Sequence, residues 1–498
     1  MSCDDSPQQS DSQQSDSQHS DSQLGAAEDW LLRFRQVHPS AACRDHDPKF
    51  GPVFVRGAGS RLWDVQGREF IDLTCGYSAA SFGQAFPPLV DAATRQLHRL
   101  THVTGEPHVG RIELAERLLQ LFQFAPNDSR VMFNVTGARA VETAWKAAVA
   151  FRPGKLLTVG PCYHGRSIAT LALAPLPQKS HASPSPSHAA TAFSSHDSPS
   201  RETSSPQQHP SSWQSQVINA PIDAYPYCAV CPLGLKYPSC ELKCVRPVLQ
   251  TIADRAGEIS AVLVEPAIGA RGTIAPPSEF LLKLRQLTQQ HDILLIADEI
   301  QTGLGRYGSL SLAHSQGWRP DLLIIGKSLG GGLVPISAVL GRAVVLESLP
   351  IGSESETYAA SPLATAVAME VVHQLCSGPW MARGAELGAR LRALVSDELG
   401  CNDPGRGVGS VVVEGAGACC VIEFAQASSK QQGAAVARQL AEMCLRNGLL
   451  TQLSGPHLSR LALFPAFTMS DAEYECAALR LQNACSSVKY PSPPESAH

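Results

Sequence analysis

The stretch His291-Asp-Ile-Leu-Leu-Ile-Ala-Asp-Glu-Ile-Gln-Thr-Gly-Leu-Gly-Arg306 is followed along the chain by Asp321-Leu-Leu-Ile-Ile-Gly-Lys-Ser-Leu-Gly-Gly-Gly332. Each segment holds a short apolar run, typical of a buried strand, that leads to a charged residue with glycines just beyond it. The charged residues are Asp298 and Lys327. Because the carboxyl ends of parallel strands line the ligand crevice of a sheet, we expect both side chains to point into one site.

A buried carboxylate and a buried amine at such a crevice suit pyridoxal phosphate. The amine of Lys327 would form the Schiff base with this cofactor. The carboxylate of Asp298 would keep the pyridine nitrogen protonated, so that the ring withdraws electrons. The spacing alone leaves a second interpretation open, in which the two residues form a structural ion pair at the strand ends.

Further apolar runs alternate with helical patterns and predict a parallel α/β sheet built from βαβ units. The expected strands cover residues 131–133, 155–159, 259–264, 293–297 and 322–325. After Ala364 the pattern changes and predicts a smaller C-terminal α+β domain. We expect its helices at 387–399 and 434–446, its strands at 411–413, 420–424 and 461–464, and a last helix that begins at a capping box formed by Ser470 and Glu473.

Two polar stretches predict disorder and divide the chain. Residues 1–24 hold 8 Ser, 6 Gln and 5 Asp, and residues 178–216 hold 13 Ser, 5 Pro and 4 His. Such segments cannot bury enough apolar surface to offset the entropy of folding. We therefore expect a disordered tail (1–24), an N-terminal segment with a β-hairpin around Gln66-Gly67 (25–85), a large domain (86–350) interrupted by a disordered insertion (178–216), and a small domain (351–490).

Composition excludes several classes of protein. The 498 residues include 40 basic and 45 acidic side chains, and the net charge of −5 argues against a nucleic-acid binder. No run approaches the roughly 18 apolar residues of a membrane helix, and the polar N-terminus does not resemble a signal peptide. The odd number of cysteines, 15, favours reduced thiols and a cytoplasmic location.

The literal sequence is similar to a known family. The segments Leu295-Ile-Ala-Asp-Glu-Ile-Gln-Thr-Gly-Leu-Gly-Arg-Tyr-Gly308 and Gly326-Lys-Ser-Leu-Gly-Gly-Gly-Leu-Val-Pro335 resemble the signature of class III pyridoxal-phosphate aminotransferases, and the resemblance extends from about Gly57 to Ala484. It implies a fold-type-I transferase in which Lys327 is the Schiff-base lysine and Asp298 the partner of the pyridine nitrogen. It also implies that Gln301 contacts the ring hydroxyl.

A phosphate-binding turn is predicted at Asn134-Val-Thr-Gly-Ala138, where a strand ends and a helix begins. Free amides at a helix start bind phosphate, as the helix dipole favours. A Thr-Gly pair before a helix can also be an ordinary cap. The resemblance assigns Thr136, Gly137 and Ala138 to the phosphate, although Arg139 stands where the family commonly has an acidic residue.

Three further segments match cofactor elements of the family. Tyr163-His-Gly-Arg166 resembles the element whose aromatic ring stacks on the pyridine, with core packing of Tyr163 as the alternative. Glu265-Pro266 resembles the Glu-Pro turn near the ring. Thr357 lies in a segment similar to the one whose threonine reaches the phosphate of the neighbouring subunit, which implies a homodimer with shared sites.

The substrate residues depart more from the family. Gly76-Tyr-Ser-Ala79 resembles the Tyr-Ser-Ala of ornithine aminotransferases, and Tyr77 with Arg166 could bind a carboxylate. The glutamate of that family's Glu-Pro-x-x-Gly-Glu turn is Ala270 here, which argues against specific ornithine chemistry. Ala462 stands where many members have an arginine. Arg460 lies on the same side of the strand and could replace it, or be an exposed strand-end residue.

Four cysteines, Cys228-x2-Cys231-x8-Cys240-x3-Cys244, have a spacing compatible with zinc. The surrounding loop also resembles one found in some class III members that is not a metal site, so we expect no metal.

The expected activity is ping-pong transfer of an amino group from an amino acid or amine, ω-amino acids included, to a 2-oxo acid, with Lys327 moving the proton. The alternatives are a racemase, epimerase or decarboxylase of the same family, and a non-catalytic homologue. We expect small-molecule substrates, and neither nucleic acid nor membrane as a partner.

Overall fold

The computed structural model describes residues 28–39, 51–174, 214–399, 411–424, 430–455 and 458–488. The expected tail, 1–24, and residues 178–213 of the expected insertion lie outside the described residues. The described chain falls into two compact units. One contains the residues up to Gly57 together with Arg61–Phe70, and the other contains Ala58–Ser60 and most of the chain from Ile71 onward.

The first unit contains a helix at 28–37 and the predicted hairpin. Its strands are β1 (Phe54–Ala58), β2 (Arg61–Asp64) and β3 (Glu69–Asp72), of which β1 and β3 end in residues of the second unit. Gly67 turns the hairpin with a φ of 78°, a left-handed conformation that glycine adopts without strain. Arg61 and Glu69 form an ion pair across the two strands at 2.7 Å.

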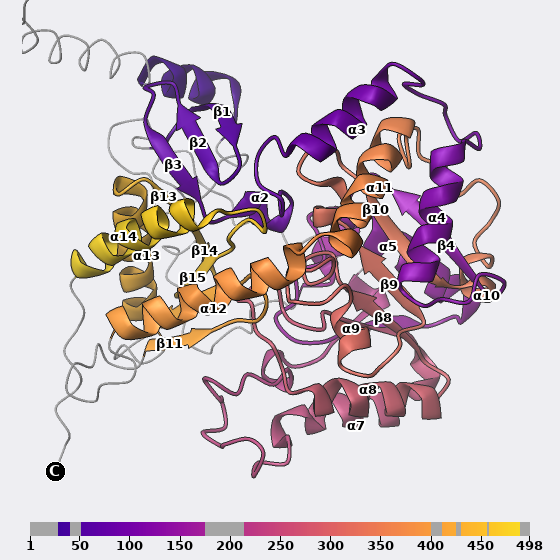
Figure 1. The fold of residues 1–498 in the computed structure, drawn as a ribbon. Coiled ribbons are helices and arrows are strands. Elements are labelled where there is room, and N and C mark those ends of the chain that lie inside the picture. Colours follow the sequence, from indigo (N-terminus) through magenta and orange to yellow (C-terminus); the bar gives the residue numbers. More distant parts are fainter. Residues whose placement is uncertain are drawn as a thin grey trace, which may run out of the picture. The chain divides into compact units, whose positions relative to one another are not determined.

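The large sheet of the second unit has the strand order β4-β10-β9-β8-β7-β5-β6 (Figure 1). All strand pairs are parallel except those made by β10, which runs antiparallel to β4 and β9. All five strands that the sequence predicted for this sheet are confirmed. The strands are β4 (Ser129–Asn134), β5 (Lys155–Thr158), β6 (Val217–Asn219), β7 (Ile259–Val264), β8 (Leu294–Asp298), β9 (Leu322–Ile325) and β10 (Ser337–Arg342).

Both faces of this sheet are covered, which explains why its central strands are continuous apolar runs. Along β8, Leu294 and Ile296 join a core with helix α5, whereas Leu295 and Ala297 join a core on the opposite face. The first face is covered by α5 (Gly137–Phe151) and α10 (Ala343–Leu346). The second is covered by α3 (Pro87–Leu97), α4 (Val109–Leu121), α7 (Arg246–Asp254), α8 (Ser278–Gln290) and α11 (Pro362–Ser377).

A second sheet is antiparallel and belongs to the C-terminal part of the chain. Its order is β11 (Val411–Glu414), β12 (Cys420–Phe424), β15 (Arg460–Leu463) and β14 (Gln452–Ser454). Three helices share a core with one face: α12 (Trp380–Glu398), α13 (Lys430–Arg446) and α14 (Asp471–Ser486). These elements confirm the predicted α+β region. The capping box is also confirmed, since Ser470 Oγ accepts from the N–H of Glu473 at 3.2 Å and Glu473 Oε2 accepts from the N–H of Ser470 at 2.9 Å.

The remaining elements are short, and one of them, the strand at 449–450, pairs in parallel with residues 71 and 72. They are α2 (Cys75–Ser78), α6 (Ile168–Ala172), α9 (Leu312–Ser315), β13 (Leu449–Leu450), and the 3-10 turns η2 (Gln214–Gln216), η3 (Ile222–Ala224), η4 (Lys243–Val245), η5 (Ala256–Glu258) and η6 (Lys327–Gly330). Of the helices described, none combines the length and the apolar character needed to cross a membrane.

Candidate active site

Three adjacent parallel strands, β7, β8 and β9, lead to charged side chains. Glu265 follows β7, Asp298 is the last residue of β8, and Lys327 follows β9 after Gly326. The strands are neighbours in the sheet, and Asp298 pairs with Ile324 of β9. The fold therefore gathers the carboxylates and the amine at the carboxyl edge of the sheet, as the sequence predicted.

Lys327 lies in a restricted environment. Its φ of 41° is left-handed, a conformation that costs free energy for a residue with a side chain. Its Nζ donates to Gln301 Oε1. Burial lowers the pKa of Lys327 to about 8, although the charges of Glu265 and Asp298 act in the opposite direction. Near neutral pH this amine is therefore neutral, and nucleophilic, far more often than the amine of an ordinary lysine.

Gln301 connects Lys327 to the turn that follows β7. A Cβ added to Gly269 of this turn would lie 2.9 Å from Gln301 Cδ, so the glycine permits the close packing. The buried Nε2 of Gln301 finds no hydrogen-bond partner in the described part of the chain. Because a buried unpaired donor is costly, the site retains a donor suited to a ligand oxygen.

Asp298 is held by two donors. Its Oδ2 lies 2.7 Å from His164 Nδ1, and its Oδ1 accepts from the N–H of Ile300 at 3.0 Å. Burial lowers the pKa of His164, but Cys162 and the hydrogen bond to Asp298 outweigh this effect and raise the pKa well above its ordinary value. His164 was not among the residues predicted for the site. The feature of the sequence that could have indicated it is its position next to Tyr163 in the segment Tyr163-His-Gly-Arg166.

Glu265 organises the backbone around this cluster. Its Oε1 accepts from the N–H of Tyr163 and its Oε2 from the N–H of Gly269, each at 2.8 Å. Burial raises the pKa of Glu265 to about 7, Asp298 adds to the shift, and His164 opposes it. The carboxylate thus fixes the chain at Tyr163, the residue predicted to stack on the cofactor ring.

The predicted phosphate turn begins helix α5. Thr136 is its N-cap, and its Oγ1 accepts from the N–H of Arg139 at 3.3 Å. The described contacts leave the N–H groups of Gly137 and Ala138 for an anion at the positive end of the helix. A Cβ on Gly137 would lie 2.9 Å from Ile300 Cδ1, so the glycine permits close packing against Ile300.

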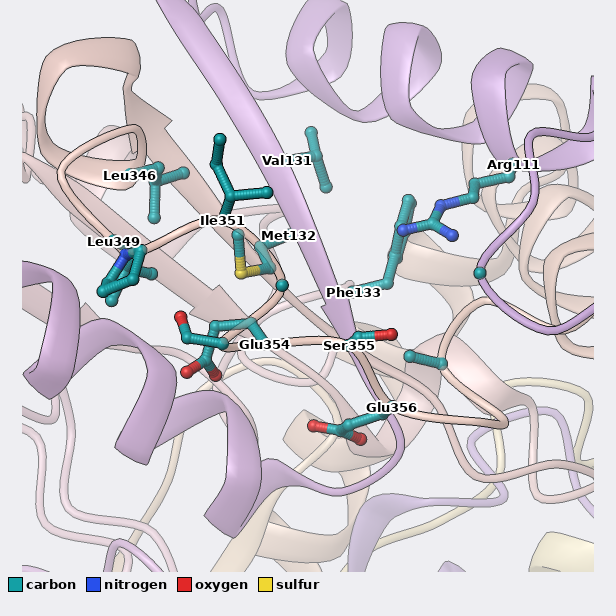
Figure 2. A pocket seen from close by; sticks show the side chains of 15 residues that line it. Arg111, Val131, Met132, Phe133, Leu346, Leu349, Ile351, Glu354, Ser355 and Glu356 are labelled. Atoms are coloured by element: carbon teal, nitrogen blue, oxygen red, sulfur yellow. The ribbon is translucent and has the colours of Figure 1, made fainter.

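Thr357 is exposed and makes no hydrogen bond with any residue that the structure describes. The segment before it borders a pocket of about 330 Å³ (Figure 2). Val131 and Ile351 lie on one side of this pocket, and Glu354, Ser355 and Glu356 lie on another. Neither Lys327 nor Asp298 lines it, so this pocket is separate from the charged cluster.

Two of the predicted substrate residues, Arg166 and Tyr77, differ in their exposure. Arg166 is exposed and has no ion pair with another described residue. Tyr77 is half-buried in a left-handed stretch, with a φ of 60°. Such strained backbone is often found at functional sites.

The guanidinium of Arg460, the third predicted substrate residue, already donates hydrogen bonds to acceptors of the protein itself. Arg460 is buried at the start of β15, and its guanidinium donates to the carbonyl of Gly272 and to Glu423. It also lies 3.3 Å from Glu414 and 4.4 Å above the ring of Tyr227. These contacts join the small sheet to the turn that follows Glu265.

The four cysteines of the loop carry free thiols, and Cys240 is buried. Burial raises the pKa of Cys228 and of Cys244, and neighbouring cysteines add to both shifts. In the described ranges, no group of three or more His, Cys, Asp or Glu side chains is placed to hold a metal ion.

Comparison with known proteins identifies the family. The Aminotransferase class-III family profile matches residues 42–485. An acetylornithine aminotransferase of Xanthomonas campestris pv. campestris is 30% identical over 87% of this chain and 92% of its own length. The 4-aminobutyrate aminotransferase GabT of Escherichia coli is 29% identical over 90% of this chain and 96% of its own length.

The fold agrees with this similarity. An ornithine aminotransferase structure from Toxoplasma gondii, described with pyridoxal phosphate at its active site, covers 96% of this chain and 99% of its own with a TM-score of 0.70 and 25% identity. The resemblance, the α/β fold and the transaminase activity expected from the sequence are confirmed. This chain belongs to the class III aminotransferases and is a pyridoxal-phosphate-dependent transaminase of fold type I.

Proposed function

We propose that pyridoxal phosphate is held at the carboxyl edge of the large sheet, with Lys327 as its covalent attachment and Asp298 at its ring nitrogen. The observation that carries this proposal is the meeting of Glu265, Asp298 and Lys327 at the ends of three adjacent strands. Gln301 Nε2 has no partner among the described residues and fits the ring hydroxyl. The N–H groups of Gly137 and Ala138, which the described contacts leave open, fit the phosphate together with Thr136.

When bound, pyridoxal phosphate supplies an electron sink for the bond that breaks at the substrate carbon. The role of Asp298 is to remain anionic, and the hydrogen bond from His164 supports that state. The role of Lys327 is to move a proton, for which its lowered pKa of about 8 is suitable. Tyr163, fixed at its N–H by Glu265, would cover the ring, and Thr357 would reach the phosphate of a second subunit.

We propose an amino acid or amine, ω-amino acids included, as donor and a 2-oxo acid as acceptor. The relatives described above act on acetylornithine, 4-aminobutyrate and ornithine, as their names state. The guanidinium of Arg166, which has no ion pair with another described residue, suits the carboxylate of such molecules together with Tyr77. Arg460 could contribute only if a carboxylate displaced its contacts with Glu423 and Gly272.

A homodimer and a cytoplasmic location complete the proposal. The dimer is supported by the exposure of Thr357, which finds no partner among the described residues of its own subunit. The location is supported by the odd number of cysteines, 15.

A half-reaction tests the function. Pyridoxal phosphate-loaded protein is mixed with one amino donor and no oxo acid, over a panel of α- and ω-amino acids. A transaminase converts the bound cofactor stoichiometrically to its amino form and releases one oxo product, and it then aminates pyruvate or 2-oxoglutarate. Exchange of the substrate hydrogen with solvent, without an oxo product, would instead identify a racemase. The Lys327→Ala variant, compared with the surface variant Lys283→Ala, should lose the absorbance band of the lysine-bound cofactor.

A further inference from the structure

The segment that carries Thr357 is bonded to the predicted phosphate turn of the same chain. Glu356, one residue before Thr357, accepts from Asn134 Nδ2 at 2.8 Å and from the N–H of Val135 at 3.1 Å. It also accepts from Arg139 Nε at 2.9 Å. All three donors belong to the strand end and helix start that form the turn, so one carboxylate spans the junction between the two segments.

Glu354 makes a second connection. Its Oε2 accepts from Thr143 Oγ1 at 2.6 Å and lies 3.3 Å from Arg139 Nη2, and its Oε1 pairs with Lys146. The side chain of Glu354 is only 4% exposed, and that of Glu356 is 16% exposed. Figure 2 shows both carboxylates turned away from Val131 and Ile351. Arg139 is the side chain that binds both.

The position of Arg139 requires an explanation, because a cation in the first turn of a helix opposes the helix dipole. Two carboxylates beside an anion site would also repel a phosphate. Arg139 and Lys146 balance the charges of Glu354 and Glu356, and the planar guanidinium can hold two carboxylates at once. Arg139 thus removes the repulsion between these carboxylates and a phosphate, and it fixes the segment 354–357.

We propose that Arg139 is a positioning residue for the cofactor phosphate, which acts by holding the segment 354–357 against the turn 134–138 and by neutralising Glu356. The proposal rests on the function proposed above, in which that turn binds the phosphate of its own subunit and Thr357 reaches the phosphate of the second subunit. It explains the departure of Arg139 from the family as a compensation for the acidic pair at 354 and 356.

The test is a double-mutant cycle on cofactor affinity. Apoproteins of the wild type, Arg139→Gln, Glu356→Gln and the double variant are titrated with pyridoxal phosphate, and the Kd is read from the absorbance of the lysine-bound cofactor. Arg139→Gln should raise the Kd about tenfold, as expected for a lost partly buried charged contact. Adding Glu356→Gln should recover part of this loss, because the unbalanced carboxylate is removed. Arg139→Lys should lie between the wild type and Arg139→Gln.

The matched control is Arg130→Gln. Arg130, on strand β4, forms an exposed ion pair of 2.8 Å with Glu347 at the end of helix α10, and its replacement should leave the Kd unchanged. An unchanged Kd in Arg139→Gln would overturn the proposal. Strictly additive effects of the two substitutions would also overturn it, because Arg139 would then act on the phosphate directly. Thermal unfolding of the apoproteins identifies a folding defect, in which case Arg139→Lys carries the test. If the wild type itself shows no lysine-bound cofactor, the proposed function fails instead.

Discussion

His164 Nδ1 lies 2.7 Å from Asp298 Oδ2, and both side chains are buried behind the end of strand β8. The two residues are far apart in the chain and meet because β5 and β8 both flank β7. The contact orients Asp298, and the raised pKa of His164 favours a charged imidazole beside the carboxylate. Without His164, the buried carboxylate of Asp298 would keep only the N–H of Ile300 as a described donor and would hold a ring nitrogen less firmly.

His164→Phe should therefore lower kcat by about 10- to 100-fold, as for loss of one charge-assisted hydrogen bond in a buried site. KM for the amino donor should change little, since His164 does not touch the substrate. The measurement is steady-state kinetics that report kcat and KM separately. His98→Ala, at the exposed C-terminus of helix α3, serves as control. Equal kinetics in both variants would contradict the role given to His164.

The pH dependence of apoprotein stability should report the burial of Lys327. Burial lowers its pKa in the folded state from 10.5 to about 8, so the unfolded chain binds more protons between these values. Stability relative to Lys327→Met should consequently rise as the pH increases from about 8 to about 10.5, by on the order of 1–3 kcal/mol. Urea unfolding of both apoproteins across this range measures the difference. If the free energies of unfolding of the two apoproteins change with pH in parallel, the amine of Lys327 is not desolvated in the folded state.

Gly137→Ala should weaken the phosphate turn. Its Cβ would lie 2.9 Å from Ile300 Cδ1, so the side chain of Ile300, helix α5 or the turn after Asp298 must move. Overpacking of this kind costs about 1–3 kcal/mol. We expect a lower melting temperature and a higher Kd for pyridoxal phosphate. Gly257→Ala is the matched control, because an added Cβ there meets nothing within 4 Å. If Gly137→Ala and Gly257→Ala have similar melting temperatures and similar Kd values, the packing at Gly137 is not tight.

Replacement of Arg166 by alanine should affect substrate binding, whereas replacement of Arg460 should affect the stability of the fold. Arg166→Ala should raise KM for carboxylate substrates at least about tenfold without changing the melting temperature, because it loses only a ligand contact. Arg460→Ala should instead destabilise the fold by about 3–5 kcal/mol, since it leaves Glu423 buried and unpaired. Denaturant unfolding and steady-state kinetics of both variants test this contrast. A raised KM with normal stability in Arg460→Ala would make it a substrate residue.

The sequence by itself determined the strands that lead to Asp298 and Lys327, because a continuous apolar run followed by a charged residue is a local pattern. It also determined the helix cap at Thr136 and the capping box at Ser470, which depend on neighbouring residues alone. The literal motif around Lys327 was enough to predict the family and its cofactor.

Only the tertiary structure decided the partners of these side chains. His164 reaches Asp298, Arg139 reaches Glu356, and Arg460 reaches Glu423 across long separations in sequence. Spacing along the chain contains no information on such contacts, because sheet order and the path of the connecting segments bring them together. For the same reason the sequence suggested that Arg460 was free for a substrate, whereas the fold places its guanidinium between Glu423 and the turn at Gly272.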